Sequence, residues 1–407
     1  MTYRAYFKLQ FTLLSPLSIG DSFSEKSDKD VILDSRGQPV IPATSIAGVL
    51  RSLASNKDAL FGCLEDKKNG KLQQDSQLIF YDAALDTGSA IVARDCVALD
   101  QYKVAKPGAK FDFQAVETGA KFVGYAEAHN EDAKAELEKL LSNALSFGAK
   151  TTRGYGKVEL KYQCKEFQSS ELKEWLEFDL FDWSDEDWFD VITQVNPDVI
   201  SLTLQLEQRG GLSIRQYLTD MAQDDADKEK GADYGPVSLR DGTPVIPGTS
   251  WAGMFKHRMK TILGVDLPDD VFGFVLTDEK AKEAKKREER TCQKSKIAFS
   301  ESQITNGTPK LLTRNMIDRF TNGTKDGALY TELTVYNGTT ELEITLYNDI
   351  PPEVKVALCA TIMDLHNGYV AVGGLTAVGR GLFNVAEVNG KEFDGNFGRL
   401  KEVLGCD

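Results

Sequence analysis

Hydroxyl, glycine and basic side chains recur at the same spacing in two places along this chain of 407 residues. The segment PVIPATSIAG at 39–48 returns as PVIPGTSWAG at 244–253, with eight identities in ten. Helix-start N–H groups, hydroxyls and nearby cations together suit a phosphate backbone. The sequence therefore predicts two phosphate-binding cradles, formed by Thr44, Ser45, Gly48 and Arg51 in the first copy and by Thr249, Ser250, Gly253, Lys256 and Arg258 in the second.

Loop aspartates precede each of these cradles. Asp28 lies three residues before the segment VIL, and Asp233 lies four residues before VSL. A carboxylate beside a phosphate can hold Mg²⁺ or Mn²⁺ and orient a ribose hydroxyl for attack on that phosphate. Asp28 and Asp233 are therefore the candidate catalytic and metal-binding residues. The alternative, that both are solvated turn residues, stays open.

A glycine loop precedes the last strand of each copy, FGAKTTRGYGKVEL in the first and VGGLTAVGRGLFNV in the second. A strand follows the glycines, which argues against a dinucleotide-binding fingerprint, since that motif needs a helix there. Charge and stacking instead suit single-stranded nucleic acid, bound through Arg153, Gly154, Tyr155, Gly156, Gly379, Arg380 and Gly381. The alternative is that the glycines only form tight turns and that the hydroxyls of the cradles only cap helices.

Histidine and cysteine chemistry is poorly supported. His129, His257 and His366 show neither metal-ligand spacing nor a Ser–His–Asp order. The six cysteines are scattered without a C-x-x-C pair, so we expect reduced thiols in a cytoplasmic protein and no structural zinc. No apolar run approaches the ~20 residues of a membrane helix, and the first residues alternate like a strand, unlike a signal peptide.

The elements that must position these residues follow one order in both halves. Apolar residues alternate from Phe7 to Leu13 and from Ile200 to Leu206, which predicts an opening strand in each half. A helix is expected after each PVIP, with Ser45 and Ser250, or the adjacent threonines, as N-caps. Second helices are expected at 131–146 and 351–366.

This order predicts an α+β fold of two tandem ferredoxin-like (RRM-like) βαββαβ domains at 1–164 and 199–407. An acidic aromatic linker at 165–198 would join them, and it holds most of the net charge: residues 171–198 carry −9 of the −14. The rest of the chain is near neutral once 219–233, at −4, is also set aside, so the acidic total does not exclude a basic groove. The linker aromatics either pack across the two domains or dock a basic protein.

The ordered set of motifs resembles the RAMP superfamily of CRISPR-associated proteins, and in particular the fused backbone subunits of type III (III-D-like) effector complexes. The resemblance rests on both PVIP segments, on LFG and VFG, on SQLIFYDA and SKIAFSES, on RNMIDRFTNGTKDGALYTE and on both glycine loops. It implies that each half is a palm with a β-hairpin thumb, at 100–113 and 318–330. It also implies that the helix and glycine-loop surface holds guide RNA.

In catalytic members of that superfamily, a loop aspartate before the first hairpin cleaves target RNA with a metal ion. The resemblance places this residue at Asp28 and, in the second copy, at Asp233, where Asp220, Asp224, Asp225 and Asp227 are rivals. The implied partners are guide RNA, target RNA, other RAMP backbone subunits and a large polymerase-like subunit. A non-catalytic RNA-binding subunit, a guide-processing endoribonuclease and a protein-only assembly module remain alternatives.

Overall fold

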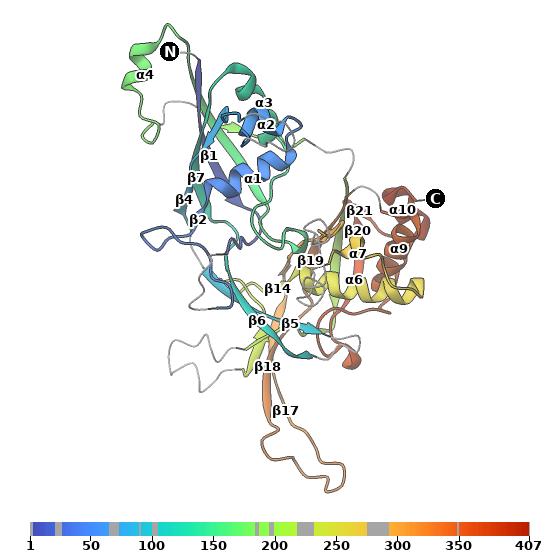
Figure 1. The fold of residues 1–407 in the computed structure, drawn as a ribbon. Coiled ribbons are helices and arrows are strands. Elements are labelled where there is room, and N and C mark those ends of the chain that lie inside the picture. The colour runs from blue at the N-terminus through green and yellow to red at the C-terminus, as the bar shows by residue number, and fades with distance from the viewer. Residues whose placement is uncertain are drawn as a thin grey trace, which may run out of the picture. The chain divides into compact units, whose positions relative to one another are not determined.

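The computed structural model describes residues 3–20, 27–64, 73–88, 91–99, 105–183, 187–194, 199–217, 232–274, 293–347 and 350–406 (Figure 1). The chain divides into two compact units, Met1–Thr151 with Tyr155–Asn196 and Thr152–Gly154 with Pro197–Asp407. The rival acids at 220–227 and most of the charged segment at 278–296 lie outside the described residues.

The first unit is built on one antiparallel sheet of seven strands with the order β2-β4-β7-β1-β8-β9, in which β3 also pairs with β7. Phe7, Leu9 and Phe11 point to the helix-covered face and are fully buried, as their alternation predicts. The elements are β1 (Arg4–Leu13), β2 (Val40–Ile41), α1 (Ala43–Leu53), α2 (Lys57–Phe61), β3 (Leu78–Phe80), β4 (Ala83–Thr87), β5 (Ile91–Leu99), β6 (Ala105–Val116), β7 (Lys121–Ala128), α3 (Glu131–Leu141), β8 (Val158–Phe167), α4 (Leu172–Glu177) and β9 (Phe189–Asp190).

The second unit repeats this sheet with the order β14-β16-β19-β10-β20-β21, in which β15 also pairs with β19. Trp251 and Phe255 of its first helix are fully buried against the sheet. The elements are β10 (Ile200–Arg209), β11 (Gly211–Leu212), β12 (Arg215–Tyr217), β13 (Tyr234–Pro236), β14 (Val245–Ile246), α6 (Gly248–Leu263), α7 (Asp269–Phe272), β15 (Ile297–Phe299), β16 (Ser302–Thr305), β17 (Thr308–Arg314), β18 (Tyr330–Tyr336), β19 (Thr339–Leu346), α9 (Pro352–His366), β20 (Leu382–Val388), β21 (Lys391–Glu392) and α10 (Phe397–Leu404).

Both sheets have the ferredoxin-like arrangement that the sequence predicts. In each, the opening strand lies between the last strand and the strand that precedes the second helix, as in β7-β1-β8 and β19-β10-β20. Near the C-terminal ends of the first helices, Leu53 and Ile262 are 45% and 38% exposed. The residues of these helices that face the core are Ile46 and Leu50 on α1 and Trp251, Met254, Phe255 and Met259 on α6.

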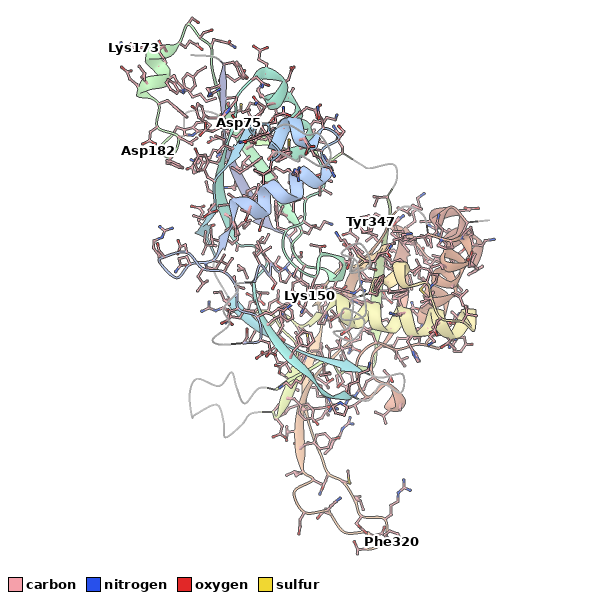
Figure 2. The ribbon with its side chains drawn as sticks, in the orientation of Figure 1. Asp75, Lys150, Lys173, Asp182, Phe320 and Tyr347 are labelled. Atoms are coloured by element: carbon pink, nitrogen blue, oxygen red, sulfur yellow. The ribbon has the colours of Figure 1, made fainter. Side chains whose placement is uncertain are left out.

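Each unit also carries a long β-hairpin that leaves the sheet (Figure 1). In the first unit β5 and β6 pair only with each other. In the second unit β17 pairs with β18 in a separate sheet that also contains β11, β12 and β13. The hairpins extend well beyond the expected thumb residues 100–113 and 318–330, and Phe320 at the end of the second hairpin is 98% exposed (Figure 2).

The segment expected to be a linker folds against the first unit. Trp175 donates its indole N–H to the hydroxyl of Tyr6 at 2.7 Å, and Phe178 packs on Tyr6 and Phe167. Phe181 contacts the rings of Tyr81 and Tyr125 edge-on. The first compact unit accordingly extends to Asn196, and within it these aromatics cover the outer face of the sheet, which differs from packing across two domains.

Candidate RNA-binding and cleavage site

The first helix of each unit presents a matching exposed face. Thr44, Gly48 and Arg51 on α1 are exposed, and Thr249, Gly253 and Lys256 hold the same helical positions on α6 and are exposed too. Their spacing of i, i+4 and i+7 places each set on one side of its helix. A Cβ atom added at Gly48 or Gly253 would meet nothing within 4 Å. Internal packing therefore does not explain either glycine.

The hydroxyl residues do not cap these helices, which corrects the expectation for Ser45, Ser250 and the adjacent threonines. The N-caps are Pro42 and Pro247, each with extended backbone (φ −60°, ψ 142°) and no side-chain cap. The backbone N–H of Ala43 instead donates to Asp82 at 2.7 Å. A carboxylate thus already occupies the positive end of α1, which leaves the exposed helix face as the candidate phosphate-binding surface there.

The cations of these two helices divide into surface and packed groups. Arg51 pairs with Asp58 at 2.9 Å on the surface, and Lys256 is exposed near the Phe272 ring. Arg258 is partly buried and bonds Asp364 of α9 at 2.7 Å. Arg258 therefore joins α6 to α9, and its role in RNA binding stays a prediction.

The glycine loops are tight turns of the same shape in both units. Gly156 and Gly381 have φ of 78° and 74°, and a side chain at either would overlap the carbonyl oxygen of Phe147 or Val372. Lys150 and Leu375 also match, with left-handed φ of 59° and 55°. Close backbone approach therefore explains these glycines, which favours the structural alternative for the glycine motif.

The side chains between the loop glycines lie inside the protein, contrary to the stacking role predicted for them. Tyr155 is 3% exposed and packs edge-on against Phe113 of β6, with ring centroids 5.6 Å apart. Arg380 is 4% exposed and bonds Glu332 of β18 at 2.7 Å. Each loop is thus fastened to the hairpin of its own unit, by an aromatic pair in the first and by an ion pair in the second.

Arg153 and Gly154 are only partly exposed. These residues group with the second unit, where the Arg153 guanidinium donates to the carbonyl oxygen of Phe272 at 3.0 Å. Burial lowers the pKa of Arg153. A side chain at Gly154 would overlap backbone atoms of Ser300 and Glu301.

Asp28 and Asp233 occupy equivalent positions against the two hairpins. The N–H of Asp112 on β6 donates to the Asp28 carboxylate at 3.0 Å, and the N–H of Thr331 on β18 donates to the Asp233 carboxylate at 2.7 Å. Both aspartates are exposed. The structure thus brings each predicted catalytic residue against the second strand of a hairpin, with Asp233 in register with Asp28.

The two aspartate sites differ in the oxygen ligands that they could offer to a metal ion. Asp112 accepts the N–H of Asp28 at 2.9 Å, so two carboxylates lie together in the first unit. Thr331 takes the place of Asp112 in the second unit. No group of three or more His, Cys, Asp or Glu side chains suited to a metal occurs among the described residues. One or two carboxylates with substrate phosphates suffice for Mg²⁺, so Asp28 and Asp112 fit this ion better than Asp233 does.

Sequence reasoning missed Asp112 and Lys150. Asp112 is 84 residues from Asp28, and only a pairing of the loop with the hairpin could have revealed it. The Lys150 ammonium is buried without a hydrogen-bond partner and lies 3.0 Å from the ring centroid of Phe113 (labelled Lys150, Figure 2). Burial lowers the pKa of Lys150 to about 8.

We expect Lys150→Leu to raise the free energy of unfolding at pH 7 by about 1 kcal/mol, because an unpaired buried ammonium is removed. Leu375 already occupies the same backbone conformation in the second unit. The unfolded lysine keeps its proton to about pH 10.4. Wild-type stability should therefore rise from about pH 8 to pH 10, and the variant should lose this rise. Urea unfolding at pH 7 and at pH 9.5 measures the stability gain and its pH dependence, and the exposed Lys157→Leu variant is the control. If the stability of both variants depended on pH in the same way, Lys150 would not be the group that causes the rise.

Two ferredoxin-like sheets, each with a hairpin fastened to a glycine loop, define a tandem protein of the RNA-recognition-like α+β class. The RAMP superfamily model matches residues 10–159 and 218–384, one segment in each half, and the chain belongs to that superfamily. Membership gives the protein a CRISPR-associated, RNA-binding role. A comparison with curated proteins finds no match. None of the helices in the described ranges is long and apolar enough to span a membrane.

Proposed function

We propose that this protein is a tandem backbone subunit of a type III CRISPR effector complex, which holds guide RNA and cleaves complementary target RNA. The observation that carries the proposal is the repeated placement of an exposed aspartate against the second strand of a hairpin: Asp28 contacts β6 and Asp233 contacts β18. Other RAMP backbone subunits and a large polymerase-like subunit would complete the complex. This proposal extends the family assignment to a reaction and to an assembly.

The exposed faces of α1 and α6 would bind the RNA backbone. Arg51 and Lys256 supply charge and Thr44 and Thr249 supply hydroxyls, while Gly48 and Gly253 let a phosphate approach the helix backbone. The second hairpin would act as the thumb. Its end carries the exposed apolar residues Met316, Ile317, Phe320 and Leu329, and apolar side chains of this kind can wedge between stacked bases.

Asp28 with Asp112, and Asp233 in the second unit, would hold Mg²⁺ or Mn²⁺ beside the hairpin strands. The ion would polarise the scissile phosphate and favour the deprotonated form of an attacking hydroxyl. The protein's own part is to fix the carboxylates through the backbone bonds to Asp112 and Thr331. RNA that copurifies with the chain, identified by sequencing and by ultraviolet crosslinking to α1 and α6, tests the binding half of the proposal. A complex that purifies without RNA would contradict it.

A non-catalytic RNA-binding subunit is the second candidate. The same backbone hydrogen bonds favour it, because each aspartate also serves as a purely structural anchor for a hairpin. Cleavage of target RNA distinguishes the catalytic subunit from the non-catalytic one. Cleavage assays on variants with asparagine in place of Asp28 and Asp233 test for it.

Gly48→Ala and Gly253→Ala are expected to stabilise the fold while weakening RNA binding. Alanine favours a helix over glycine by about 0.5–1 kcal/mol, and there is open space for each Cβ. If RNA approaches these helices, the added methyl groups should lower RNA affinity by about tenfold. Thermal unfolding and filter binding measure the two effects. Ala135→Gly on the exposed side of α3 is the matched control, with reduced stability and unchanged RNA affinity. Unchanged RNA affinity in the alanine variants would count against RNA binding by the α1 and α6 faces.

A further inference from the structure

Three planar groups stack beside Asp233 in the second unit. The guanidinium carbon of Arg215 lies 4.4 Å from the ring centroid of Tyr234. The rings of Tyr234 and Tyr330 stack with centroids 5.8 Å apart and planes inclined by 26°. Arg215 is exposed and both tyrosines are partly exposed. These residues, called here the Arg–Tyr–Tyr stack, present flat aromatic surface and positive charge at one place.

Strand register fixes this stack next to the candidate cleavage residue. Tyr234 follows Asp233 in the chain, and Tyr330 precedes Thr331, whose N–H donates to the Asp233 carboxylate at 2.7 Å. The same register pairs Tyr234 with Glu332 across β13 and β18. The stack therefore flanks the carboxylate from both strands.

The surroundings of the stack carry an excess of positive charge. Three arginines approach the single carboxylate of Glu332, which is 2% exposed: Arg380 at 2.7 Å, Arg215 at 3.7 Å and Arg314 at 3.9 Å. The side chains of Arg215 and Arg314 are 39% and 37% exposed, so the positive charge that Glu332 does not neutralise is accessible to solvent. One buried acid thus orients two arginines that remain available to an anion.

A cavity lined by two members of the stack is too small for an organic ligand. Its volume is about 10 Å³, and Arg215, Tyr234 and Glu332 are among its lining residues. That is room for about one water molecule. A planar ligand must therefore bind on the solvent-exposed surface of the stack. Phosphate groups attached to such a ligand would lie near the exposed side chains of Arg215 and Arg314.

We infer that the Arg–Tyr–Tyr stack holds an unpaired RNA nucleobase beside Asp233, with Arg215 and Arg314 facing the adjoining phosphates. The inference rests on the proposed function and names its contact with RNA at the second unit. Stacking of a base on an aromatic ring accepts any base, so the stack positions a nucleotide without selecting its sequence. The three residues are positioning residues for cleavage at Asp233.

The first unit has different residues at the matching positions. Counting from the repeated motifs, Gly20, Lys29 and Phe111 correspond to Arg215, Tyr234 and Tyr330. A single exposed ring, Phe111, and the exposed Lys29 replace the stack. With one ring in place of the three stacked groups, we expect weaker base stacking beside Asp28 than beside Asp233.

The test uses the full chain in its assembled complex, with 2-aminopurine placed at successive positions of either the guide or the target strand. Quenched fluorescence at one position of one strand would show which strand supplies the base. Tyr330→Leu keeps apolar bulk but removes the flat ring, and it should relieve the quenching and weaken RNA binding by about tenfold. Tyr330→Phe keeps the ring and should match the wild type. Arg215→Gln should reduce the slope of log affinity against log salt by about 0.7.

Equal quenching in Tyr330→Leu and Tyr330→Phe would overturn the inference while leaving RNA binding through α1 and α6 intact. RNA binding absent from every variant and from the wild type would instead overturn the proposed function. Melting curves for both variants verify that the hairpin is folded. Quenching that persists in Tyr330→Leu with normal melting thus counts directly against the stack.

Discussion

Replacing Asp28 by asparagine is expected to lower target RNA cleavage at one set of positions by about 100-fold or more. The asparagine side-chain oxygen can still accept the Asp112 N–H that Asp28 accepts at 3.0 Å. The fold should therefore persist while the negative charge that holds a metal ion is lost. Single-turnover cleavage of a complementary RNA by the assembled complex, with Mg²⁺ in excess, measures the change at each product.

Asp233→Asn should abolish the other set of products and leave those of Asp28 unchanged. Because Thr331 stands where the first unit has Asp112, the Asp233 products should require more Mg²⁺ than the Asp28 products. Thr331→Asp, which supplies the second carboxylate, should lower that requirement. Unchanged products in the double variant Asp28→Asn, Asp233→Asn would eliminate the catalytic role of both residues and leave the non-catalytic subunit as the function.

Replacing Arg380 by alanine should destabilise the second unit by about 3–5 kcal/mol, because the Glu332 carboxylate would remain buried without its closest cation. The two side chains are only 4% and 3% exposed, and their atoms are 2.7 Å apart. Glu332→Ala should cost a similar amount. Chemical unfolding followed by hydrogen exchange in β18 and in the glycine loop reports on this unit alone.

The first unit supplies the matched rescue for this pair. Arg380→Tyr combined with Glu332→Phe reproduces the Tyr155–Phe113 contact, whose ring centroids are 5.6 Å apart. We expect the double variant to recover more than half of the stability that is lost when Arg380 or Glu332 alone is replaced. Neither Arg380→Tyr nor Glu332→Phe alone should recover it. Stability losses that simply add would show that the two positions are not coupled, and the loop would then be held by other contacts.

Local patterns in the sequence were sufficient to predict the fold. Alternation from Phe7 to Leu13 describes a sheet with one buried face, and the repeat transfers every element to the second half. The position of Asp233 also follows from the repeat, since it stands 205 residues after Asp28, the same offset that separates the two PVIP motifs. The structure places both aspartates against the hairpins, whereas their catalytic role stays a prediction.

The functions of individual side chains were harder to predict because their partners are distant in the chain. Tyr155 and Arg380 suit RNA stacking by type, yet their partners lie 42 and 48 residues earlier, on hairpin strands. The hydroxyl capping rule failed at both helices since Pro42 and Pro247 occupy the cap position, and Asp82 satisfies the Ala43 N–H from another loop. Contacts of this range leave no trace in local spacing.

The acidic segment held against the first sheet has a consequence for the kinetics of RNA capture. Residues 171–198 carry −9 of the chain's −14 charge, and contacts such as Lys8 to the Trp183 carbonyl oxygen at 3.1 Å keep the described part of the segment on the sheet's outer face. A polyanion diffusing toward that face meets repulsion, so productive encounters favour the opposite, helix-covered face. Such a field acts mainly on the association rate, which should become less sensitive to the direction of approach as salt screens the segment.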